Sequence, residues 1–401
     1  MQTPQLSLEL QLVLAGALIP LQPTEIERLG ELCAQPGLDW EKTEQIAKHH
    51  GLAAVLYTNL ISHAAGLVPE SVKASLKNEA QRNYKINLHL TAEIIRLDKL
   101  LSPTGISICP IKGPLLSKQL YGDLGLRATR DIDLLLPEDQ VLAAEKTLLA
   151  AGYIRTAPRT ALSPAQWKFY KNKAHHFHFE YPKRRGLIEI HWALSSPDLL
   201  PVSTTRQFLS RARPLQEYPS MLGLADEDLF CFLVFHGAKH GWELFKWLAD
   251  IALLMRRSPD LDWQTIHAQM AEFDLLRPLG QGLLLAQDLF NVQAPPQAMP
   301  LLDQPPVQRL AQKALAISTS DDGFGGEPGR FLGFNILRYT LGLKTSWKSK
   351  FFQLYNAWIN PEDWDDLILP EWLFPLYSPL RPFLWLHRYH LPWSKKKLSA
   401  R

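Results

Sequence analysis

Two aspartates begin an apolar segment, Asp131-Ile-Asp133-Leu-Leu-Leu136-Pro137, which has the composition of a buried strand. Side chains alternate between the faces of a strand, so Asp131 and Asp133 leave the same face with Cα atoms roughly 6.5 Å apart. Two adjacent like charges need a cation between them, and a divalent metal with oxygen ligands is the usual choice. The alternative is a solvated Asp-x-Asp loop, which the apolar run after Asp133 disfavours. The segment therefore predicts a strand that carries a cation site at its start.

Composition places the chain among ordinary globular proteins. Its 401 residues are enough for two or three domains, and 43 basic against 40 acidic residues leave a formal net charge of +3. This balance gives no field that requires a polyanionic partner, so no stable nucleic-acid binding is expected. Three widely spaced cysteines fit a reducing compartment, and the first twenty residues lack the basic start and apolar core of a signal peptide. We expect a cytoplasmic protein.

The spacing of apolar residues changes along the chain and predicts an organisation in five segments. They are an N-terminal helical region (1–101), an α/β core (102–195), a helical domain (196–316), a flexible loop and linker (317–344) and an aromatic-rich C-terminal segment (345–401).

Strand and helix patterns alternate within the predicted α/β core. The turn Lys112-Gly113-Pro114 suits the start of a helix, because proline is well tolerated in the first turn. A long helix over 69–101 precedes the core. The expected elements of the core are a strand at 106–111, a helix from Pro114 to Leu120, a strand at 131–136, a helix from Val141 to Leu149 closed by Gly152, and a hairpin of 175–181 with 187–194.

A third carboxylate, Glu189, interrupts the apolar strand Leu187-Ile-Glu189-Ile-His191-Trp192. If this strand lies beside the Asp-Ile-Asp strand, Glu189 joins Asp131 and Asp133 in a cage of oxygen ligands for one or two Mg²⁺ ions. Two such ions could stabilise the attacking and leaving oxygens of a phosphoryl displacement. The alternative is an ion pair between Glu189 and a basic residue of the hairpin such as Arg184.

These motifs, in this order, resemble the nucleotidyltransferase superfamily of the DNA polymerase β type. More narrowly, the chain is similar to a largely uncharacterised bacterial nucleotidyltransferase family, and the resemblance covers nearly all of it. The matching motifs are Lys112-Gly113, Leu126-Arg127-x-x-x-Asp131-Ile-Asp133-Leu-Leu, Ile188-Glu189-Ile-His191-Trp192, His236-x-x-x-His240-Gly-Trp242, Leu244-x-x-Trp247, Asp250, and the closing Leu369-Pro370 and Leu380-Arg381-Pro382.

The resemblance implies an α+β fold: a polymerase β-like core, with a mixed sheet and helices on one side, flanked by all-helical regions. It implies transfer of a nucleoside monophosphate from an NTP such as ATP to an acceptor, with release of pyrophosphate. Asp131, Asp133 and Glu189 would be the catalytic residues and the ligands of Mg²⁺ or Mn²⁺. The acceptor, whether a small molecule, a protein or an RNA end, is not readable from the sequence.

The resemblance and the basic residues around the aspartates also imply a set of nucleotide contacts. Pro114 departs from the superfamily, in which a small hydroxyl residue follows the glycine, and proline has neither a hydroxyl nor an N–H for phosphate. For Arg127 and Arg130, the alternative to a phosphate contact is a salt bridge to the acidic cluster. The expected nucleotide-binding residues are Lys112, Gly113, Arg127, Arg130 and His240.

The histidines support a rival interpretation. His175, His176 and His178 lie on one predicted strand of the hairpin, opposite Glu189 and His191, so a His-rich transition-metal site and a zinc hydrolase are open alternatives. In the alternative interpretation, which is favoured, His191 supports a neighbouring site residue without binding a metal, or packs beside Trp192.

The predicted helical domain holds further titratable residues within its apolar helices. His236 and His240 share a helix face and could bind a metal, but their apolar neighbours favour a packed or hydrogen-bonded pair. Asp250 is expected in an internal ion pair with Lys239 or Lys246.

A catalytically degenerate fold that acts as a binding or assembly module, for example in surface polysaccharide production, is the second class of function, and Pro114 favours it. The C-terminal segment combines Trp372, Tyr377 and Phe383 with a terminal Lys395-Lys396-Lys397. This composition predicts a packed aromatic core, with a weak membrane-surface contact as the alternative.

Overall fold

The computed structural model describes residues 6–159, 161–182, 184–197, 199–320, 334–357, 367, 369–370, 373 and 376–390. The chain divides into two compact units. Unit 1 consists of Met1–Asp133 and Arg211–Thr345, and unit 2 of Leu134–Ser210 and Ser346–Arg401. Helices and strands together confirm the α+β class, whereas the polymerase β-like core and the five segment boundaries stay predictions.

The N-terminal part of unit 1 is helical, as its spacing predicts. Ser7 and Asp39 cap two of the helices with side-chain oxygens that accept backbone N–H groups. The long helix predicted over 69–101 is confirmed, and its apolar stripe is buried at Val72, Leu76 and Leu90. The helices are α1 (Leu8–Ala15), α2 (Pro23–Cys33), α3 (Trp40–His49), α4 (Ala53–His63) and α5 (Glu70–Leu101), with short 3-10 turns at Ala65–Leu67 and Ser102–Thr104.

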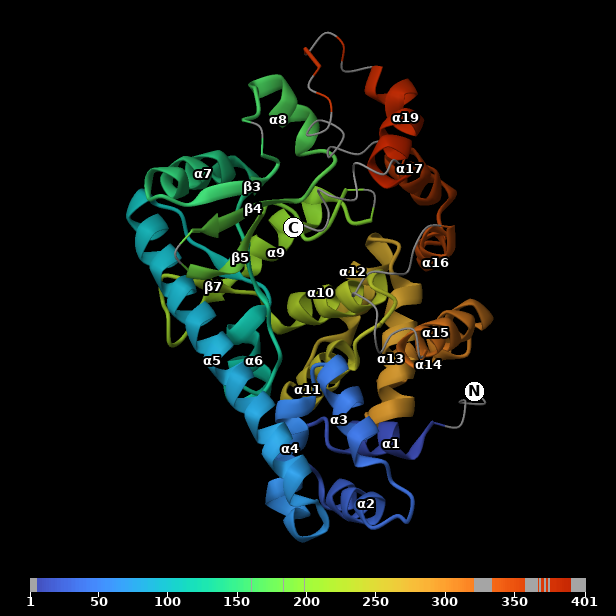
Figure 1. Ribbon diagram of the computed structural model, residues 1–401. Coiled ribbons are helices and arrows are strands. Elements are labelled where there is room, and N and C mark those ends of the chain that lie inside the picture. The colour runs from blue at the N-terminus through green and yellow to red at the C-terminus, as the bar shows by residue number, and fades with distance from the viewer. Residues whose placement is uncertain are drawn as a thin grey trace. The chain divides into compact units, whose positions relative to one another are not determined.

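The second helical part of unit 1 is built around one buried helix. Helix α13 packs against α10, α11, α14 and α15, and its glycines Gly280 and Gly282 allow close approach of Val307 and Trp242 (Figure 1). The helical spacing predicted for this region is confirmed. Its helices are α10 (Asp226–Lys239), α11 (Phe245–Arg257), α12 (Trp263–Glu272), α13 (Leu276–Phe290), α14 (Met299–Leu302), α15 (Pro305–Ser318) and α16 (Phe334–Leu343), with a 3-10 turn at Pro296–Ala298 and a small ribbon of β6 (Arg213–Pro214) and β7 (Leu222–Gly223).

Unit 1 also holds the start of the sheet. Strand β1 (Cys109–Pro110) is followed by α6 (Gly113–Tyr121), as predicted for this helix, and then by β2 (Asp131–Leu135). The Ile111 N–H donates to the Asp133 carbonyl over 3.2 Å and joins these two strands. The strand predicted over 106–111 is shorter than expected, because Pro110 has no N–H and Ile108 bonds instead to Leu222.

Unit 2 contains the antiparallel part of the sheet. The end of β2 is followed across the sheet by β5 (Arg184–His191), β4 (His176–Tyr181) and β3 (Ile154–Ala157). β4 pairs antiparallel with β5 and with β3, so the predicted hairpin is confirmed. The remaining helices are a 3-10 turn at Glu138–Gln140, α7 (Val141–Ala150), α8 (Pro164–Tyr170), α9 (Val202–Arg211), α17 (Trp347–Ala357) and α19 (Tyr377–His390).

One face of the β4–β5 hairpin is an aromatic core. Phe177 and Trp192 are fully buried with ring centroids 5.0 Å apart, and Trp167 and Tyr170 of α8 pack against both. The Trp192 indole N–H donates to the Lys171 carbonyl over 3.1 Å, which satisfies its polar atom. This apolar face forces the alternate residues of both strands onto the opposite face.

Some predictions concern segments that the structure only partly covers. The Gly-rich loop predicted after Ser318 lies mostly outside the described residues, as do Trp372 and the terminal lysines. Of the described aromatic residues in the C-terminal segment, Tyr377 is buried, whereas Trp347, Phe351, Phe352 and Phe383 are exposed, so the packed aromatic core predicted there is wrong for these four. Among the residues that the structure describes, no helix is both long and apolar enough to cross a membrane.

Candidate functional site

Asp133 lies at the centre of the candidate site in unit 1. Its side chain is 0% exposed, and Oδ1 lies 3.0 Å from the Lys112 ammonium, whose side chain is 17% exposed. Asp131 begins the same strand and is half-buried, whereas the intervening Ile132 is buried in the core. A buried carboxylate requires a positive partner, and Lys112 supplies one from the turn that follows β1.

The turn after β1 brings backbone close to the acidic strand. Gly113 begins α6 with a φ of +79°, a conformation that favours glycine, and a Cβ there would lie 3.6 Å from the Asp131 carbonyl oxygen. Pro114 stands in the first turn of this helix and contributes no N–H. The helix start therefore has one donor fewer for an anion than an ordinary helix N-terminus.

Arg127 is held in a buried ion pair. Its Nε lies 2.9 Å from both carboxylate oxygens of Asp250 in α11, one Nη lies 2.9 Å from Oδ2, and the Tyr121 hydroxyl donates to Oδ1 over 3.0 Å. Asp250 is thus in an internal ion pair as expected, but its bonded partner is Arg127, 123 residues away in sequence, rather than a lysine of its own region. The Arg127 side chain is only 4% exposed, and the phosphate contact expected of it stays a prediction.

Lys246, which the sequence analysis did not select as a site residue, reaches the same region. Its ammonium donates to the Ala128 carbonyl over 3.0 Å, next to the exposed Arg130. Gly51, at a φ of +70°, leaves the space for this side chain, since a Cβ there would lie 2.8 Å from Lys246 Cδ. Burial, together with the positive charge of Arg127, lowers the pKa of Lys246 to about 7, although Asp250 and Asp131 oppose this shift. Lys246 could have been identified from the sequence, because it interrupts the apolar run Leu244-Phe245-Lys246-Trp247.

His240 is exposed at the end of α10 and belongs to a ring cluster. Its ring centroid lies 4.8 Å from that of His236 and 5.3 Å from that of Trp247. Burial lowers the pKa of His236 well below its ordinary value, and the positive charge of Lys112 adds to this effect. The predicted packing of the His236–His240 pair is therefore confirmed, and His240 leaves an aromatic surface open to solvent.

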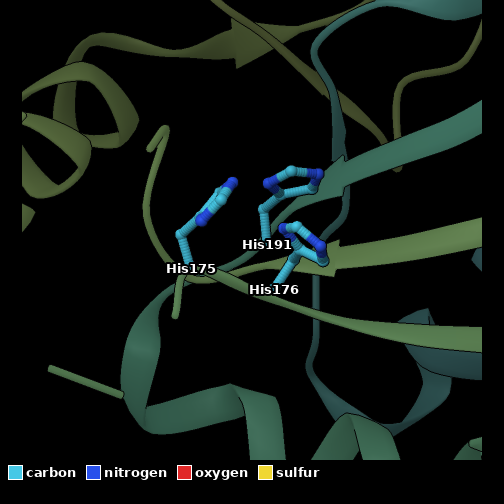
Figure 2. A group of neighbouring side chains, drawn as sticks. All are labelled: His175, His176 and His191. Carbon is cyan, nitrogen blue, oxygen red and sulfur yellow. The ribbon is translucent and has the colours of Figure 1, made fainter. Parts of the chain in front are cut away.

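Glu189 lies in unit 2 among histidines. Its Oε2 lies 3.0 Å from His191 Nε2 and its Oε1 lies 3.4 Å from His178 Nε2. His191 is buried on the same face of the hairpin as Glu189, and Trp192 is buried among the aromatic residues described above. His175, His176 and His191 gather beside one another at the start of β4 (Figure 2).

Comparison with known proteins identifies a family but no individual relative. A search of curated proteins and a search of solved structures each gave no match. The family model described as "uncharacterised nucleotidyltransferase" matches residues 36–291, which include Lys112, Asp131, Asp133, Glu189 and Asp250. The match covers more than half of the chain, so this protein belongs to that nucleotidyltransferase family.

Proposed function

We propose that the protein is a metal-dependent nucleotidyltransferase that moves a nucleoside monophosphate from an NTP to an acceptor and releases pyrophosphate. The observation that carries this proposal is the fully buried Asp133 carboxylate, paired with Lys112 at the start of a strand in a chain of this family. A carboxylate is costly to bury, so a protein keeps one inside where it serves to hold cations.

Strand register supports a common site for the three carboxylates. In unit 2, the Leu136 N–H donates to the His191 carbonyl over 2.9 Å, and both residues stand at the C-terminal ends of β2 and β5. We infer from this bond that the two strands run in the same direction. The proposal has Asp131 and Asp133 of β2 and Glu189 of β5 contribute their carboxylates to one cation.

Asp131, Asp133 and Glu189 fit a hard dication, because all three offer carboxylate oxygens from strands rather than mobile loops. They would hold Mg²⁺ or Mn²⁺, which supplies charge neutralisation for the triphosphate. In the proposal, Glu189 is also the general base: its carboxylate accepts the proton of the acceptor hydroxyl. The hydrogen bond from His191 keeps this carboxylate oriented.

Several cations near β2 would bind the polyphosphate. Lys112 and Arg130 are the first candidates, because the Lys112 side chain retains some exposure and Arg130 is exposed. Lys246 adds a third basic group, which the Ala128 carbonyl holds beside the segment that leads to Arg130. Arg127 would act indirectly, by fixing the segment 127–130 to α11 through Asp250. His240 and Trp247 offer ring faces on which a nucleobase could stack.

The experiment is a transfer assay with each α-labelled NTP, Mg²⁺ or Mn²⁺, and a cell extract as the source of acceptors. We expect a labelled product that requires the metal, and loss of at least about a hundredfold in rate in Asp131→Asn and Asp133→Asn. Asp139→Asn, an exposed aspartate after β2, is the matched control and should keep full activity.

Two outcomes would contradict the proposal. One is the absence of any labelled product or self-modification, together with no NTP binding by calorimetry. The other is unchanged binding of Mn²⁺ and NTP in both aspartate variants, which is the result expected of a binding or assembly module that has kept only the fold.

A further inference from the structure

A set of histidines in unit 2 shares one face of the β4–β5 hairpin. The antiparallel register aligns His176 with His191 and His178 with Glu189. The alternate residues, including Phe177 and Ile190, are buried on the other face, which fixes the histidines opposite them. The sequence thus builds a polar face in which imidazoles, rather than charged or hydroxyl groups, predominate.

His175 joins this face from the segment just before β4. Its carbonyl accepts the Trp192 N–H over 3.0 Å, so its backbone is tied to the end of β5. Ring centroids lie 4.3 Å apart for His175 and His176, 4.9 Å for His176 and His191, and 5.6 Å for His175 and His191. One ring nitrogen from each of the three lies within 4.8 Å of the other two, and the rings are turned toward one another (Figure 2).

The hydrogen bonds of the cluster determine which ring nitrogens face inward. His191 uses Nε2 toward Glu189 Oε2 at 3.0 Å, and His176 uses Nε2 toward His178 Nε2 at 2.7 Å. A neutral imidazole that donates from one nitrogen offers a lone pair on the other, and in the tautomers in which His176 and His191 donate from Nε2 that lone pair is on Nδ1. A carboxylate bonded to the far nitrogen of a histidine is the usual support of a metal-ligating imidazole, and Glu189 occupies that position for His191.

We propose that His175, His176 and His191 bind one transition-metal dication of the Zn²⁺ class, with Glu189 orienting His191. In tetrahedral coordination with Zn–N bonds of about 2.0–2.1 Å, ligand nitrogens stand about 3.3 Å apart. The three nitrogens, now within 4.8 Å of one another, need to close by at most about 1.5 Å. Three neutral nitrogen ligands select zinc, nickel, copper or cobalt over Mg²⁺, which prefers oxygen.

Such an ion would join the segment before β4 to the end of β5. Its binding energy would then stabilise the hairpin that carries Glu189. Glu189 and His191 take part both in this site and in the proposed function, and the variants tested therefore leave both residues unchanged.

The test uses untagged, chelator-treated full-length protein with Zn²⁺ as the probe. We expect one Zn²⁺ per chain after dialysis, measured by elemental analysis, and a rise in the unfolding temperature on adding Zn²⁺. His175→Ala and His176→Ala should each weaken binding by about a hundredfold or more, measured against a chromophoric chelator. The matched control is His89→Ala, since His89 is an exposed histidine of α5.

Further variants keep the proposal falsifiable if an alanine disturbs folding. His175→Gln retains the size and polarity of the side chain, and we expect it to lose the metal while its circular dichroism spectrum stays that of the wild type. His178→Ala should lower affinity by about 10- to 100-fold, less than either ligand variant, because His178 supports His176 without ligating. Asp131→Asn should bind Zn²⁺ normally even where nucleotidyl transfer is lost.

Stoichiometric Zn²⁺ binding by both His175 variants would overturn the proposal, as would the absence of zinc binding by the folded wild type. A loss in His178→Ala and His176→Ala, with binding kept in the His175 variants, would overturn it as well, because it would assign the metal to His176, His178 and Glu189, which also lie within reach of one ion.

Discussion

Replacing Asp250 by asparagine should strongly destabilise unit 1, because it leaves the Arg127 guanidinium buried without its counter-ion. The pair has three nitrogen–oxygen contacts of 2.9 Å, and its side chains are 4% and 0% exposed. Tyr121 would also lose a charged acceptor for its hydroxyl. The environment therefore provides no water to replace the lost charge.

The magnitude follows from this burial. Removing one partner of a buried, hydrogen-bonded ion pair costs about 3–5 kcal/mol. Because asparagine keeps one acceptor oxygen, we expect Asp250→Asn to lower the free energy of unfolding by about 3 kcal/mol. Arg127→Met should cost a similar amount for the converse reason. The double variant Arg127→Met/Asp250→Leu removes both charges and should lose much less than the sum of the two single changes.

The assay is urea unfolding followed by tryptophan fluorescence, with Asp139→Asn as an exposed control expected within about 0.5 kcal/mol of the wild type. A cost below about 1 kcal/mol for Asp250→Asn would refute the reasoning. If Arg127→Met left stability intact and instead abolished NTP affinity, the phosphate contact predicted from sequence would be right and the positioning role wrong.

Three other changes test the local geometry. Burial lowers the pKa of Lys246 to about 7 from an ordinary value of 10.5, so between pH 7 and 10.5 the unfolded chain binds more protons and the free energy of unfolding rises with pH. Lys246→Met should remove this rise, which is at most about 1.4 kcal/mol per pH unit, and urea unfolding at pH 7, 8 and 9 measures it. Gly113→Ala meets no close neighbour but forces a side chain to a φ of +79°, so a loss of about 1–2 kcal/mol is expected, and a neutral result would contradict the left-handed turn. Gly237→Ala would place a Cβ 2.1 Å from the buried Trp242 ring, so calorimetry should show a loss above about 2 kcal/mol; an unchanged unfolding temperature would argue against this packing.

The long elements of the fold were predictable because each repeats one period over many residues. The helix expected over 69–101 is observed at Glu70–Leu101, and Gly152 follows α7 with a positive φ as expected. Strand β3 was missed, since its four residues are half-exposed and show no clear alternation. Helix α8 was also missed, although Ser163 and Gln166 form a capping box at its start that the sequence displays.

The residues of the candidate site also differ in how far the sequence predicts them. Asp131, Asp133 and Lys112 were readable because a charge at the edge of an apolar run is unusual wherever it occurs. The pairing of Arg127 with Asp250 was not readable, since it joins residues 123 positions apart and either residue could have paired locally. The position of Lys246 depends equally on Gly51, which precedes it by almost two hundred residues.

The most direct test of the central claim is the Mn²⁺ dependence of NTP affinity, measured by calorimetry in Asp131→Asn, Asp133→Asn and Glu189→Gln. If the three carboxylates hold the metal together, each single change should remove most of the Mn²⁺ effect, and combining them should add little further loss. Wild-type affinity in Glu189→Gln, alongside lost affinity in the two aspartate variants, would contradict a shared site.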